Sequence, residues 1–224
     1  MDNSLTYYTV ASVIEAFILW LYCNKLFKQR LNTPLSILIA IIMHLLSAPV
    51  YMLHFPILNI ISFILITYIV TIIISDISFF SAIFHSLMLT VVMGLSELLV
   101  VGFVPNLYIL FFRESGTINN TALYVFISKT IYLFISQAVS TILKKRKGSY
   151  PFSDKSTLFL SIIPATSIII MLCLCFICIS IPLTSKVNAY SSVSILLLLA
   201  INMFTFYMQQ IIVRKNNENA RLLL

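Results

Sequence analysis

Three ionisable residues lie deep inside long apolar segments of the chain: Glu15, Glu97 and Lys129. A charged side chain at the centre of a bilayer costs about 2.5–3.5 kcal/mol even on the mildest scales, so such residues face the interior of a helix bundle. Counted from the ends of their segments that we expect to face outward, all three lie about 10–15 Å deep at roughly 1.5 Å per residue. The sequence therefore predicts one polar layer in the outer half of a bundle.

Glu97 and Lys129 lie on consecutive segments at matching depth and carry opposite charges. An ion pair between them is the simplest way to hold both. Two roles for the layer stay open: it forms the floor of an outward-open ligand pocket or the polar pin of a movable helix, or it is a static pair that fixes helix register. Under the first interpretation, Glu15, Glu97 and Lys129 are candidate ligand-binding or switch residues.

The cysteines and histidines predict no chemical centre. In the run Cys-Leu-Cys-Phe-Ile-Cys from Cys173, only Cys175 and Cys178 share a helix face. Metal binding needs convergent ligands with supporting hydrogen bonds, which this run does not offer, so packing thiols are favoured. Structural hydrogen bonds are favoured for His44 and His85. We predict no catalytic residue, no metal site and no cofactor.

The segments that position the polar layer are predicted to be transmembrane helices. With 60% hydrophobic and 9% charged residues and a mean hydropathy of +1.04, the chain lacks the polar residues to cover a water-soluble surface. Its apolar runs are continuous and do not alternate as in an outer-membrane barrel. The sequence predicts an all-α, polytopic bundle of about seven helices, over residues 5–22, 35–53, 57–74, 82–104, 121–143, 157–180 and 190–213.

Positive charge predicts the orientation. Lys and Arg cluster after the first, fifth and last predicted helices, within residues 25–30, 144–155 and 214–221. Such loops stay in the cytoplasm, so we expect the N-terminus outside and the C-terminus inside. The loop over residues 75–81 is then cytoplasmic although it carries no cation. The net charge of +7 is spread over juxtamembrane loops, which favours anionic lipid headgroups over nucleic acid as partners.

Proline and glycine predict local departures from straight, evenly spaced helices. Pro49 and Pro164 fall inside the second and sixth predicted helices, where we expect kinks. Gly94 and Gly102 lie two turns apart on the fourth, where we expect close helix packing.

The last predicted helix leaves the membrane without a Pro or Gly. We divide the chain into a transmembrane bundle, residues 1–213, and the start of a cytoplasmic helix, residues 214–224. An unbroken helix can transmit a displacement, and Gln209, Gln210 and Asn216 are its candidate signal-transmitting residues. A 3-4-3 spacing around Asn216 is compatible with the start of a coiled coil or with a simple solvated helix end.

This plan resembles the membrane sensor half of AgrC-type histidine kinases, whose cytoplasmic half ends in a GHKL-type ATPase domain. The resemblance rests on the short-looped Ile/Leu/Phe-rich helices, the run Leu95-Ser96-Glu97-Leu98-Leu99-Val100, and a Phe/Tyr/Met-rich last helix leading to Gln209 and Gln210. It implies a multi-pass receptor in a bacterial plasma membrane that senses a peptide and works as a homodimer or in a heterodimer with a sensor kinase.

The chain departs from that family because the sequence contains no His after His85 and no ATP-binding motif. We therefore expect no enzyme activity from it, and two explanations are open: a truncated or split sensor, or a protein that modulates an intact kinase. The alternative function is a small-molecule transporter or substrate-capture subunit. An intramembrane peptidase is disfavoured because no His and Cys, and no metal-supported acids, are placed to meet.

Overall fold

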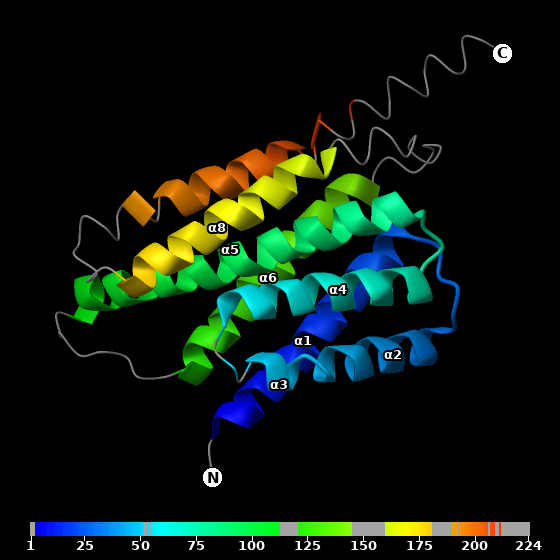
Figure 1. Cartoon of the computed structure of the whole chain (residues 1–224), viewed down its shortest axis with the longest axis horizontal. Helices are drawn as coiled ribbons and strands as arrows, with labels where there is room; N and C mark the ends of the chain where they lie inside the picture. Colours follow the sequence, from blue (N-terminus) through cyan, green and yellow to red (C-terminus); the bar gives the residue numbers. More distant parts are fainter. Residues whose placement is uncertain are drawn as a thin grey trace.

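A computed structural model describes residues 3–51, 53, 55–112, 121–144, 160–180, 190–191, 193–205, 207–208 and 211. Over these residues the chain is an all-α bundle whose helices run roughly along one long axis (Figure 1). Its elements are α1 (Asn3–Leu26), α2 (Thr33–Leu45), α3 (Ala48–Tyr51), α4 (Pro56–Ile74), α5 (Phe79–Phe112), α6 (Thr121–Lys144) and α8 (Ile162–Ser180). A further short apolar helix covers Val193–Thr205.

The predicted class, an all-α multi-pass membrane protein, is confirmed. Five spans in the described part of the chain are long and apolar enough to cross a bilayer. These spans are Thr6–Leu26, Thr33–Tyr51, Pro56–Ile74, Phe79–Val101 and Leu123–Thr141. The other two predicted spans are represented in the described residues by the apolar helices α8, Ile162–Ser180, and Val193–Thr205. The orientation of the bundle in the membrane stays a prediction.

The two predicted proline kinks have different outcomes. Pro49 separates α2 from α3: α2 ends at Leu45, and the Ser47 amide donates to the His44 carbonyl at 2.9 Å in a tight turn. Pro49 then occupies the second position of α3, where its missing N–H costs no hydrogen bond. The kink predicted at Pro164 stays a prediction: Leu160 is helical, Ser161 lies in a turn, and α8 begins at Ile162 with the proline in its first turn, while the residues just before Leu160 lie outside the described part of the chain.

Helix α5 is longer than its sequence predicts. It has 34 residues, about 50 Å at 1.5 Å per residue, against about 30 Å of hydrocarbon. The helix continues through Pro105 to Phe112, beyond the predicted end at residue 104.

Two apolar cores lie on either side of α5. Helices α1, α2, α4, α5 and α6 surround the first core, which contains Tyr22, Phe63 and Phe84. Helices α4, α5, α8 and the helix Val193–Thr205 surround the second, which contains Leu95 and Met171. Figure 1 shows α8 (yellow) and the last helix (orange) side by side along α5, on the side away from α1 and α2.

The loops that follow α1 and α4 meet at one end of the bundle. Gln29 and Ser75 form an isolated β-bridge, and the Asp76 amide donates to the Lys28 carbonyl at 2.8 Å. The Arg30 guanidinium lies 3.3 Å from the Asp76 carboxylate. The loop over residues 75–81 therefore lies beside the cation-rich loop after α1, as predicted, although it has no Lys or Arg of its own.

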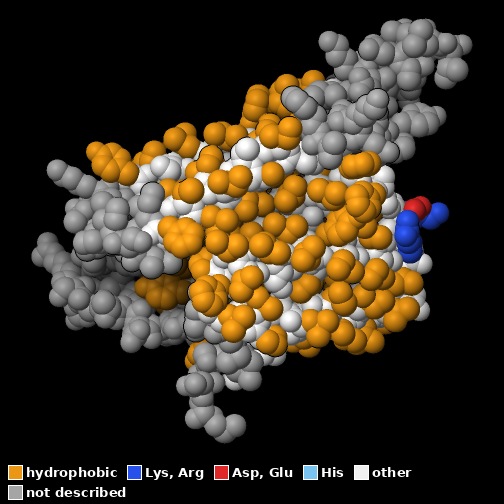
Figure 2. All heavy atoms as spheres, viewed as in Figure 1, with side chains coloured by type: hydrophobic (Ala, Val, Ile, Leu, Met, Phe, Trp, Pro, Cys, Tyr) orange, Lys and Arg blue, Asp and Glu red, His pale blue; other side chains and the backbone are white. Residues whose placement is uncertain are grey.

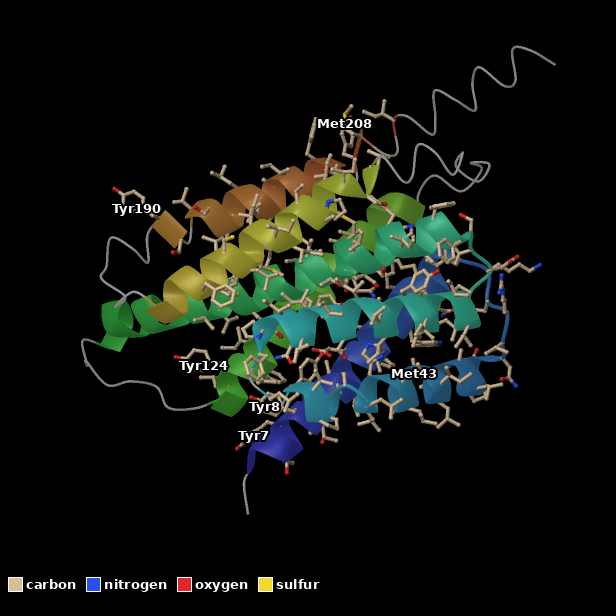
Figure 3. All side chains as sticks on the ribbon, viewed as in Figure 1. Tyr7, Tyr8, Met43, Tyr124, Tyr190 and Met208 are labelled. Carbon is tan, nitrogen blue, oxygen red and sulfur yellow. The ribbon has the colours of Figure 1, made fainter. Side chains whose placement is uncertain are left out.

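The two ends of the bundle carry different side chains. In Figure 2 apolar side chains cover the visible face, and the visible Lys, Arg and acidic side chains gather at the end that holds these two loops. In Figure 3, Tyr7, Tyr8, Tyr124 and Tyr190 lie toward the opposite end. Tyrosines are enriched at membrane interfaces and short cationic loops on the cytoplasmic side, so the arrangement suits a bundle that crosses a bilayer lengthwise.

Candidate functional site: a buried ion triad

Lys129 on α6 is bound by two acids from two other helices. Its Nζ atom lies 2.5 Å from Glu15 Oε1 on α1 and 2.6 Å from Glu97 Oε1 on α5. The exposed fractions of the side chains are 5% for Lys129, 1% for Glu15 and 48% for Glu97. The predicted layer and the predicted Glu97–Lys129 pair are thus present, and Glu15 completes a triad that the sequence did not predict as a contact.

Parallel packing of α1 and α6 holds Glu15 and Lys129 at the same level. A second polar contact lies farther along both helices: Lys25 Nζ donates to Gln137 Oε1 at 3.2 Å and to Thr141 Oγ1 at 2.5 Å. Residue numbers increase from the first contact to the second in both helices. Helices α1 and α6 therefore run parallel and in register. The triad therefore lies away from the Lys25 end, toward the end that carries the tyrosines.

The short helix α3 covers Glu15. The Tyr51 hydroxyl donates to Glu15 Oε2 at 3.0 Å, so both oxygens of this buried carboxylate are bound. The Tyr51 ring also lies 6.1 Å from the ring of Tyr8 on α1, measured between centroids. Sequence reasoning missed Tyr51, because only the break before Pro49 brings this residue over the polar layer.

Glu97 is the member of the triad that reaches the surface. It is half-exposed within the span Phe79–Val101, and Val101, one turn along the same face, is also exposed. A carboxylate in this position is accessible from outside the core, whereas Glu15 is enclosed by Lys129 and Tyr51.

Several fully buried polar atoms lie around the triad without a hydrogen-bond partner among the described residues. The His44 ring lies near both Glu15 and Lys129, and its Nδ1 atom is 3.0 Å from the Ala40 carbonyl. A carbonyl only accepts, so Nδ1 carries the hydrogen and Nε2 is an unpartnered acceptor. The hydroxyls of Ser12 and Tyr132, one turn from Glu15 and Lys129 respectively, also have no such partner. Sequence reasoning missed Ser12 and Tyr132, and it assigned His44 a structural hydrogen bond without placing it beside the triad.

His85 makes a different kind of contact. Its Nδ1 atom lies 2.7 Å from the Tyr22 hydroxyl, and the rings of Phe27 and Phe84 lie 5.0 and 5.4 Å away between centroids. This enclosure matches the structural role expected of the histidines. Within the described residues, no group of three or more His, Cys, Asp or Glu is placed to hold a metal.

A chain of contacts leads from the triad to the last helix. Gly94, one turn before Glu97 on α5, packs directly against the Met171 side chain of α8. One turn before Met171, the Ser167 hydroxyl accepts a hydrogen bond from Asn202 Nδ2 at 2.8 Å, and Asn202 lies in the helix Val193–Thr205.

The predicted signal-transmitting residues Gln209, Gln210 and Asn216 lie outside the described part of the chain. Within the described part of the last helix, the Asn202 side chain donates a hydrogen bond to another helix, and its position in a mostly apolar segment was the available signal. Comparison with protein-family models, with curated protein sequences and with solved structures finds no match for the chain.

Proposed function

We propose that the chain is the membrane-embedded sensor module of an AgrC-like histidine kinase in a bacterial plasma membrane. It detects an extracellular ligand, which is a peptide in the family it resembles, and signals through its last helix as a homodimer or in a heterodimer with a sensor kinase. The observation that supports this proposal most is the chain of contacts between the ion triad and the last helix.

The ligand acts at Glu97, the accessible residue at the start of this chain of contacts. Glu97 is half-exposed, and Lys129 is shared by two acids, so Lys129 can keep Glu15 while Glu97 turns to a ligand. A ligand that binds one of these arrangements better shifts the population toward it. The pairing of Lys129 with Glu97, formed or broken, thereby provides two discrete states of α5 relative to α1 and α6.

The route then passes through close contacts. A shift of α5 at Glu97 moves Gly94, and Gly94 has no side chain to absorb the shift before it reaches Met171. The hydrogen bond between Ser167 and Asn202 carries the displacement of α8 to the last helix. Coupling of this kind travels through packed side chains and hydrogen bonds that have alternative arrangements.

The proposal is tested by fusing the chain to the cytoplasmic half of a GHKL-type histidine kinase and measuring autophosphorylation in lipid nanodiscs. Lys129→Leu is expected to change the output or its ligand dose response. Asp76→Asn is the control, because Asp76 is an exposed acid paired with Arg30 at the other end of the bundle. An unchanged dose response with Lys129→Leu removes the triad from the mechanism.

A small-molecule transporter or substrate-capture subunit is the second candidate. Half-exposed acids within membrane spans also mark substrate and ion pathways, and Glu97 has this property. Solute uptake into vesicles that contain the chain alone distinguishes the two functions, because a sensor module gives none.

A further inference from the structure

The triad contains one more carboxylate than ammonium group. Glu15 and Glu97 contribute two negative charges, and Lys129 contributes one positive charge. An unbalanced negative charge at this depth in a membrane is unfavourable, because the low dielectric constant screens it little.

The groups that neighbouring elements place near the triad do not supply a second cation. They are His44 from α2, Tyr51 from α3 and Tyr132 from α6, beside Ser12 on α1 and Phe63 on α4. His44 is fully buried and donates through Nδ1 to a carbonyl, which suits a neutral imidazole. Among the described residues, Lys129 is therefore the cation of this site.

The unmet hydrogen-bonding groups of the site include two acceptors. His44 Nε2 is a buried acceptor with no donor among the described residues. Glu97 binds Lys129 through Oε1, and its half-exposed carboxylate can accept further hydrogen bonds through the other oxygen. A partner that docks on the exposed Glu97 carboxylate donates hydrogen bonds and carries positive charge, because the second acid of the triad has no cation of its own.

We propose that the triad binds a cationic group with several N–H donors, a primary ammonium or a guanidinium, presented by the extracellular ligand. The inference rests on the proposed function and names the chemistry that its ligand must offer. The cation docks on the Glu97 carboxylate and balances the second acid. An anionic group meets repulsion from the same acid, and a neutral apolar group leaves the acceptors unpaired.

The test uses the full chain in phosphatidylcholine nanodiscs and three six-carbon probes: hexylammonium, hexanol and hexanoate. Binding is measured by isothermal titration calorimetry, with protein-free nanodiscs as the reference for partition into lipid and potassium chloride as the reference for ionic strength. Hexylammonium is expected to bind saturably and the other two probes are not. Glu97→Gln is expected to weaken hexylammonium binding at least about tenfold, and Asp76→Asn is expected to leave it unchanged.

Equal binding of hexylammonium and hexanol to the unaltered chain overturns the inference, and so does full hexylammonium affinity in Glu97→Gln. The glutamine variant keeps the buried Glu15–Lys129 pair, and the probe comparison on the unaltered chain decides the matter even where that variant does not fold. If hexylammonium does not bind while the kinase fusion still depends on Lys129, the cationic ligand class fails and the proposed function stands.

Discussion

Lys129 Nζ and Glu15 Oε1 lie 2.5 Å apart, and both side chains are almost completely buried, at 5% and 1% exposure. The pair joins α6 to α1 within the membrane, and Glu97 extends it to α5. A buried pair contributes little compared with a well-packed apolar contact, but loss of one partner leaves a charge without compensation. The triad is therefore a place where single substitutions have large effects and matched double substitutions have smaller ones.

Lys129→Leu is expected to destabilise the bundle by about 3–5 kcal/mol, because Glu15 stays buried without its counter-charge. The thermal unfolding midpoint in detergent or nanodiscs measures the loss. The double variant Glu15→Gln/Lys129→Leu removes both charges of the pair and is expected to recover much of it. A single variant as stable as the unaltered chain contradicts the triad geometry.

Tyr51→Phe is expected to loosen α3, because it removes the hydrogen bond of 3.0 Å that ties this helix to Glu15. A lost partner of a buried charged acceptor costs about 1–3 kcal/mol. Hydrogen–deuterium exchange of the amides in α3 should become faster. Tyr68→Phe is the matched control, since the Tyr68 hydroxyl has no hydrogen-bond partner among the described residues; equal exchange in the two variants argues against a tie through Tyr51.

Gly94→Ala is expected to displace the end of the Met171 side chain, because the added methyl group overlaps its Sδ and Cε atoms. The flexible methionine absorbs part of the overlap, so the loss of stability is expected at the lower end of the range for overpacking, about 1 kcal/mol, and it lowers the unfolding midpoint. The second variant Gly94→Ala/Met171→Ala restores the space and should recover stability. If the smaller residue at position 171 gives no recovery, the two helices do not meet at this point.

Asn202→Leu and Ser167→Ala each remove the hydrogen bond that joins α8 to the last helix. A double-mutant cycle on unfolding free energy is expected to give a coupling of about 0.6 kcal/mol, the average found in such cycles for hydrogen bonds between membrane helices. Purely additive effects of the two substitutions show that the residues do not interact.

Cysteine labelling tests the predicted orientation. After replacement of the four native cysteines, Tyr7→Cys is expected to react with a membrane-impermeant maleimide on intact cells, and Gln29→Cys only after lysis. Tyr7 lies near the start of α1, and Gln29 lies in the loop that follows the other end of this helix. The reverse labelling pattern places the cation-rich loops outside and inverts the orientation.

The sequence predicted the depth of the polar residues well and their direction around each helix poorly. Depth follows from counting residues along a span, and it placed Glu15, Glu97 and Lys129 in one layer correctly. The direction in which a side chain points can be predicted only when one face of the helix differs from the others. Helices that are apolar on all faces show no such difference. The pair of Lys129 with Glu15 and the contact of Gly94 with Met171 both depend on direction.

Breaks in helices were predictable only in part. Pro49 correctly indicated an interruption, but the sequence did not show that the piece after it folds back over Glu15 as α3. Near Pro164, a turn at Ser161 separates the helical residue Leu160 from α8, which begins at Ile162 with the proline in its first turn. The position of a proline relative to the helix start decides its effect, and that start is set by tertiary packing.

The central claim is that the triad acts on the last helix through the Ser167–Asn202 contact. Autophosphorylation of the kinase fusion, measured for Lys129→Leu, Asn202→Leu and the double variant at equal amounts of folded protein, tests it most directly. The account predicts that Lys129→Leu changes the output in the unaltered background and has no further effect in the Asn202→Leu background. Independent, additive effects of the two substitutions, or no effect of Lys129→Leu, would contradict it.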